Sequence, residues 1–63
     1  MTAIRILVEN CRGWYDATAF DEIGRVCAAR DASRTEAINR AKARAVAKLD
    51  TECEFIVVDR DEE

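Results

Sequence analysis

The side chains that could carry out chemistry in this chain are few, and their types restrict the reactions that they could support. The sequence has no His, a single Ser at position 33 and three Cys. Nucleophilic catalysis by Cys or Thr requires an activating base nearby, and neither Cys11 nor Cys27 has an obvious one in the sequence. Two pairs of carboxylates fall in an expected turn and in the acidic tail: Asp21-Glu22 and Asp59-Asp61. We therefore expect no enzymatic activity, with a thiol-dependent activity as a weaker alternative.

The cysteines also limit metal and redox chemistry. Cys11, Cys27 and Cys53 are odd in number, widely spaced and without a C-x-x-C motif. Structural zinc sites use four Cys or His ligands, so a site within one chain is not expected, and we predict neither a metal nor a cofactor. Three reduced thiols, some packed as small apolar groups, indicate a cytoplasmic protein. We see no signal peptide and no run of ~20 apolar residues that could cross a membrane.

The most basic stretch is SRTEAINRAKARAVAKL, residues 33 to 49. It contains five cations and one carboxylate, a net charge of +4, so the rest of the chain carries −7 against a total of −3. Arg40, Arg44 and Lys48 recur every four residues on the side of a helix away from Ile38; we call these three residues the basic row. We expect a solvated helix face, and contact with nucleic-acid phosphates is the alternative.

Trp14 and Tyr15 are the candidate interface aromatics. They follow Gly13 at a strand start, where successive side chains point to opposite faces, so one ring should pack inward and the other outward. An outward ring could stack on a base or anchor a protein interface. The alternative is that the two rings only cover opposite faces of a small sheet.

Strands and helices must position these residues, and the sequence predicts four strands and one helix. A strand is expected at 3–9, where Ile4, Ile6 and Val8 alternate with other residues. A turn at 10–13, a second strand at 14–20, a turn at 21–24 and a third strand at 25–30 follow. The apolar run at 54–59 predicts a final strand.

Residues 34–49 are rich in strong helix formers and predict one amphipathic helix. Ser33-x-x-Glu36 matches a capping box, in which the Ser hydroxyl accepts from the Glu36 amide and the Glu side chain returns to the Ser amide. The expected apolar side is mostly alanine and consists of Ile38, Ala41, Ala45 and Leu49, with Val46 at its margin. The prediction is a single α+β domain over 1–63, a three-stranded antiparallel meander with one helix on one face and a fourth strand.

Pairing these strands in register gives two expected faces for the sheet. They are Leu7, Tyr15, Ala17, Ala19, Cys27 and Ala29 on one side, and Ile4, Ile6, Val8, Val26 and Ala28 on the other. Both sets are apolar, although one helix covers only one face. A two-sided apolar sheet in a small chain indicates self-association, so we expect a homodimer or a protein partner, with Trp14, Tyr15 and Leu7 as candidate interface residues.

The segment from Ile4 to Leu49 resembles the HicB-like antitoxin domains, in which a strand, a Gly-aromatic turn, two further strands and a Ser/Thr-x-x-Glu-Ala helix start follow one another. The matching features are Gly13-Trp14-Tyr15, Gly24 and Ser33-Arg34-Thr35-Glu36-Ala37. The closing EFIVVDRDE is similar to small uncharacterised bacterial domains in which the same helix precedes a last strand. The resemblance implies the β-β-β-α-β fold and an antitoxin-like interaction role. It does not extend to the C-terminal DNA-binding element that many HicB proteins carry, and Ile23-Gly24 stands where a Pro-Gly pair is often found.

Overall fold

A computed structural model describes residues 2–60 of the chain. Its elements are β1 (Thr2–Cys11), β2 (Trp14–Phe20), β3 (Arg25–Asp31), α1 (Arg34–Leu49) and β4 (Cys53–Asp59). The predicted α+β order of three strands, a helix and a final strand is confirmed, and the helix has the predicted bounds.

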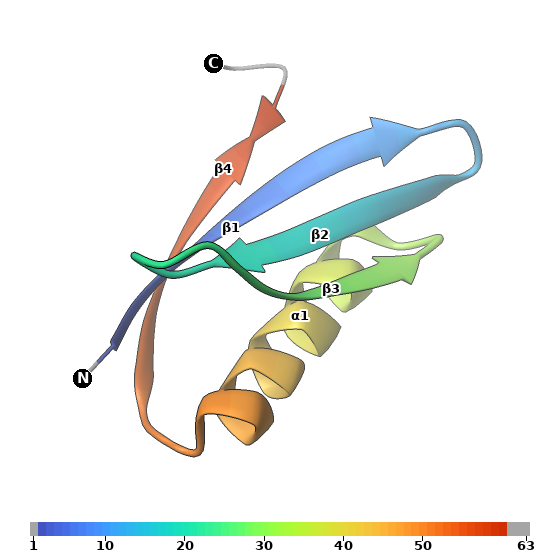
Figure 1. Ribbon diagram of the computed structural model, residues 1–63. Helices are drawn as coiled ribbons and strands as arrows, with labels where there is room; N and C mark the ends of the chain where they lie inside the picture. The colour runs from blue at the N-terminus through green and yellow to red at the C-terminus, as the bar shows by residue number, and fades with distance from the viewer. Residues whose placement is uncertain (1, 61–63) are drawn as a thin grey trace.

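The four strands form one mixed sheet in the order β3-β2-β1-β4. β1, β2 and β3 pair as an antiparallel meander, whereas β4 is parallel to β1. The chain leaves β3 at one edge, passes through α1 on one face, and returns as β4 at the opposite edge (Figure 1). β3 and β4 are therefore the two edge strands of the sheet, and α1 connects them.

A two-residue turn sets the register between β1 and β2. Gly13 takes a left-handed φ of 84°, and Cys11 and Trp14 become the last pair of the ladder. Counting back from this pair puts Val8 opposite Ala17 and Leu7 opposite Thr18. Directly opposed residues share a face of the sheet, so Val8 and Ala17 lie together and Leu7 lies on the other face.

The predicted division of the two faces was therefore wrong in part. Leu7 does not share a face with Tyr15 and Ala17, and Ala28, which pairs with Thr18, does not share one with Ile4. The residue types alone did not determine which residues of neighbouring strands lie directly opposite each other. A shift of the pairing by one residue moves every side chain of a strand to the opposite face. We call the face away from α1, which carries Leu7, the open face.

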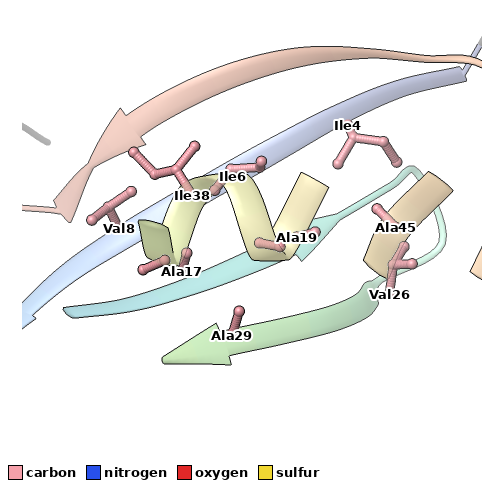
Figure 2. Close-up of a cluster of buried hydrophobic side chains, with 11 residues drawn as sticks. Ile4, Ile6, Val8, Ala17, Ala19, Val26, Ala29, Ile38 and Ala45 are labelled. Atoms are coloured by element: carbon pink, nitrogen blue, oxygen red, sulfur yellow. The ribbon is translucent and has the colours of Figure 1, made fainter. Parts of the chain in front are cut away.

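The hydrophobic core lies between the sheet and α1 (Figure 2). Its buried members are Ile4, Ile6, Val8, Ala17, Ala19, Val26, Ala29, Ala37, Ile38, Ala41 and Ala45. Three of the four helical members are alanine, so α1 approaches the sheet closely, and Ile4 and Ile6 supply the largest fully buried side chains. As predicted, Ile38, Ala41 and Ala45 face the sheet, while Leu49 is only partly buried.

The ends of α1 are closed by local hydrogen bonds. Ser33 Oγ accepts a hydrogen bond from the Glu36 amide at 3.4 Å, which is the first half of the predicted capping box. The second half was wrong, because the Ser33 amide donates to Asp31 Oδ1 at 2.9 Å rather than to Glu36. At the other end Asp50 takes a left-handed φ of 51° and its amide donates to the Val46 carbonyl, which ends the helix after Leu49.

α1 does not cover the sheet evenly. It packs mainly over β3 and β2 and touches β1 and β4 much less. In Figure 1 the helix lies under β2 and β3, whereas β4 runs along the far side of β1. This offset leaves β4 with less cover on its helix side than the other strands have.

Candidate functional site

The basic row lies along the β3 side of α1, where its side chains reach the edge strand. Arg44 donates from a terminal guanidinium nitrogen to the Ala28 carbonyl at 2.6 Å, and Lys48 Nζ donates to the Val26 carbonyl at 2.7 Å. Arg40 forms an ion pair with Asp31 at 3.3 Å. All three cations therefore have an acceptor on β3.

These contacts give the basic row a structural role that the sequence pattern did not reveal. An edge strand presents unpaired N–H and C=O groups to which another chain can add, and proteins often protect such edges with Lys or other charged side chains. Here Arg44 and Lys48 occupy two carbonyls of β3. The row is thus more than the solvated face expected from the sequence, because it also covers the β3 edge.

The other edge of the sheet is different. Among residues 2–60, no strand pairs with the outer side of β4. Ile56 pairs with Arg5 on the open face and is 58% exposed, whereas Val57 pairs with Ile6 on the helix face and is 38% exposed. β4 therefore combines an uncovered backbone edge with apolar side chains exposed on both of its faces.

The flank of α1 that faces β4 is also apolar in part. Lys42 Nζ lies 5.6 Å from the centre of the Phe55 ring, a cation–π contact. Val46 follows Lys42 by one turn on this flank and is 40% exposed. At the N-terminal end of α1, Arg34 forms a bidentate ion pair with Asp59, in which Nε donates to Oδ1 at 3.1 Å and Nη2 donates to Oδ2 at 2.8 Å. The Lys42–Phe55 and Arg34–Asp59 contacts hold β4 against α1, but Val46 and Val57 remain exposed.

The two candidate aromatics lie on opposite sides of the sheet. Tyr15 is half-buried against the core under α1, and Trp14 is 37% exposed on the open face. The guanidinium of Arg30 lies 5.0 Å above the Trp14 ring and bonds Asp16 through Nε at 2.8 Å. That hydrogen bond is the main reason that the pKa of Asp16 is lowered. Trp14 is thus partly covered by an ordered cation, while Leu7 is half-buried at the centre of the same face.

Two of the cysteines, Cys11 and Cys27, are in surroundings that raise the pKa of the thiol. Desolvation and then a hydrogen bond to Asp16 raise the pKa of the Cys11 thiol, whose Sγ donates to the Asp16 carboxylate at 3.4 Å. Burial raises the pKa of Cys27, whose Sγ donates to the Ala41 carbonyl at 3.4 Å. The thiolate is the reactive form of Cys, so these two side chains are weak nucleophiles at neutral pH.

The described residues form neither a cluster of metal ligands nor a helix that could span a membrane. No group of three or more Cys, Asp and Glu side chains in residues 2–60 is placed to hold a metal ion. Within the same range, α1 is too short and too polar to cross a membrane.

The uncovered β4 edge is the feature that sequence reasoning missed. Its signal was present in EFIVVD, a continuous apolar run in a chain whose first strand alternates. Such a run predicts a strand with apolar side chains on both faces, but it does not say which edge of the sheet the strand occupies. That position follows from the parallel pairing of β4 with β1.

The chain matches no protein-family model, and neither the curated proteins nor the solved structures contain a significantly similar sequence or fold.

Proposed function

We propose that the protein is a non-enzymatic interaction module, HicB-like in its order of elements, which acts by binding a protein partner or a second copy of itself. The observation that carries the proposal is the contrast between the two sheet edges. The β3 edge is occupied by Arg44 and Lys48 of the same chain, and the β4 edge presents Ile56 and Val57. Adding a strand to an open edge is a common mode of protein recognition.

The chemistry of the side chains supports a binding role over catalysis. The chain lacks His, its single Ser caps a helix, and the pKa values of Cys11 and Cys27 are raised. A catalytic thiol normally needs a lowered pKa and an adjacent base. In this proposal the protein works in the cytoplasm, where its three free cysteines stay reduced.

Binding of RNA or DNA by the basic row is the alternative from a different class. Arg40, Arg44 and Lys48 are exposed and aligned, as a phosphate-binding row would be. Each of them, however, already has an acceptor on β3. Phosphates would have to compete with these acceptors, so we favour the protein-binding role.

A titration of the full chain with labelled single- and double-stranded RNA and DNA oligomers, read by fluorescence anisotropy, tests this choice. We expect no binding at physiological salt. Micromolar binding that weakens steeply with added salt would overturn the proposal. In that case Arg40→Gln should reduce the slope of log K against log salt by about one unit, and it leaves the bonds from Arg44 and Lys48 to β3 intact.

A further inference from the structure

We infer that β4 pairs antiparallel with β4 of a second copy about a twofold axis at Ile56, which joins the two sheets into one. This inference deepens the proposed function, on which it rests, by naming the partner and the register of the contact. It rests on the exposed apolar side chains of β4, on the residue pairs that β4 would form with a second copy, and on the difference between the protected β3 edge and the open β4 edge.

Exposed apolar side chains gather around β4. The described residues contain five large exposed apolar side chains, and three of them are Val46, Ile56 and Val57. The other two have separate positions: Trp14 lies beneath the guanidinium of Arg30, and Ile23, at 97% exposure, lies in the turn between β2 and β3. A second β4 alongside the first would remove water from Ile56 on one face and from Val57 on the other.

The sequence of β4 is self-complementary when Ile56 lies on the axis. Ile56 then faces Ile56 of the second copy, and Phe55 faces Val57 twice. Toward the ends of the strand Glu54 faces Val58 and Cys53 faces Asp59, and just beyond the strand Glu52 faces Arg60 twice. Opposed apolar residues and opposite charges stabilise antiparallel pairs. In the single chain the guanidinium of Arg60 pairs with Glu9 of β1 at 2.8 Å, so its contact with Glu52 of a second copy requires Arg60 to change its partner.

Two other arrangements fit less well. Moving the axis to Val57 places Phe55 opposite Asp59, a carboxylate that is already bound to Arg34. A parallel in-register pair of the same edges turns the second sheet over, so that the two Ile56 side chains point to opposite faces and cannot pack together. The Ile56-centred pair keeps Phe55 opposite an apolar residue and moves Asp59 to the end of the strand, opposite Cys53.

Because the β3 edge is protected, assembly through β4 stops at a dimer. If β3 and β4 edges were both free, β3 of one copy could pair with β4 of the next and extend the sheet without limit. Arg44 and Lys48 oppose that pairing by occupying carbonyls of β3. Pairing through β4 alone uses the same strand of both copies, so growth stops at two.

Disulfide trapping of single-cysteine variants tests the inference and its register. Cys11, Cys27 and Cys53 are replaced by Ala, and Ile56→Cys or Val57→Cys is then added. Opposed Cα atoms in an antiparallel pair lie ~4.5–5.5 Å apart, within the range that a disulfide can span. With Ile56 on the axis, the two Val57 positions are roughly 8 Å apart, given a rise of ~3.3 Å per residue and a strand spacing of ~4.8 Å, which is too far.

Under mild oxidation we expect Ile56→Cys to give a covalent dimer in most of the protein and Val57→Cys to give little. Equal trapping of both variants, trapping at Val57 alone, or trapping at neither position would overturn the inference. If the Cys-free background fails to fold, as judged by circular dichroism, the same substitutions are made in the native background. The 56–56 disulfide is then sought by peptide mapping.

Failure of this inference is distinguishable from failure of the proposed function. A protein that does not trap at position 56 and does not bind nucleic acid overturns the inference and leaves an interaction module with a different partner. Salt-sensitive nucleic-acid binding overturns the proposed function itself.

Discussion

At the scale of single residues, side chains complete backbone hydrogen bonds in the turn between β2 and β3 and at the start of α1. Asp21 Oδ1 accepts from the amides of Ile23 and Gly24, at 2.8 and 2.9 Å, and so orders the turn between β2 and β3. These two bonds lower the pKa of Asp21. Ser33 has the same role at the start of α1. The chain has no proline and two glycines, so such side-chain caps determine where its elements begin.

Ser33→Ala should lower the free energy of unfolding by ~1 kcal/mol. The substitution leaves the Glu36 amide without its acceptor at the start of the only helix within residues 2–60. Chemical denaturation monitored by far-UV circular dichroism measures the effect, with Thr35→Ala as the control because Thr35 is exposed in the first turn. An unchanged unfolding curve for Ser33→Ala would show that the cap contributes nothing.

At the scale of elements, the helix and the strands differ in how far the sequence predicts them. The bounds of α1 follow from local signals, namely the Ser33 cap and the helix formers after it. Which face Leu7 occupies does not follow in the same way, because it depends on the Arg12-Gly13 turn and on the one-residue parity that the turn imposes. The contacts of Arg44 and Lys48 are less predictable still, since their acceptors lie 16 and 22 residues earlier in the chain.

The same reasoning explains what could be predicted about the candidate site. The basic row was identifiable from its four-residue spacing, and the β4 strand from its apolar run. Their different roles at the two edges depend on the strand order, which places β3 and β4 at opposite sides of the sheet. That order comes from pairings between distant segments, and no local pattern in the chain encodes it.

The double substitution Arg44→Gln and Lys48→Gln should cause the dimer to form larger oligomers. Removing both cations exposes carbonyls of β3, so that the β3 edge of one dimer can pair with an edge strand of another. Light scattering at increasing protein concentration measures the change. Arg5→Gln with Arg25→Gln is the matched control, because it removes the same charge from the open face. Equal scattering from both double variants would contradict protection of the β3 edge.

At the scale of the whole molecule, the protein is a thin sheet with one helix set to one side. The helix buries a core made largely of alanine and protects the strand nearest to it, and this leaves the far strand uncovered. A chain of this size buries only ~60% of the surface that its unfolded form exposes. Association through β4 would therefore add apolar burial where the single chain lacks it.

The central claim is that apolar residues of β4 hold two copies together, and the molar mass in solution tests it most directly. Sedimentation equilibrium of the full chain should give about 14 kDa at high concentration, twice the 7.1 kDa of one chain. Ile56→Glu should shift the mass toward the monomer, because it places two carboxylates opposite each other on the axis. Ile23→Glu makes the same change at an exposed isoleucine away from β4 and should leave the mass unaltered. A monomeric wild-type chain at all concentrations, or equal dissociation by both variants, would contradict the claim.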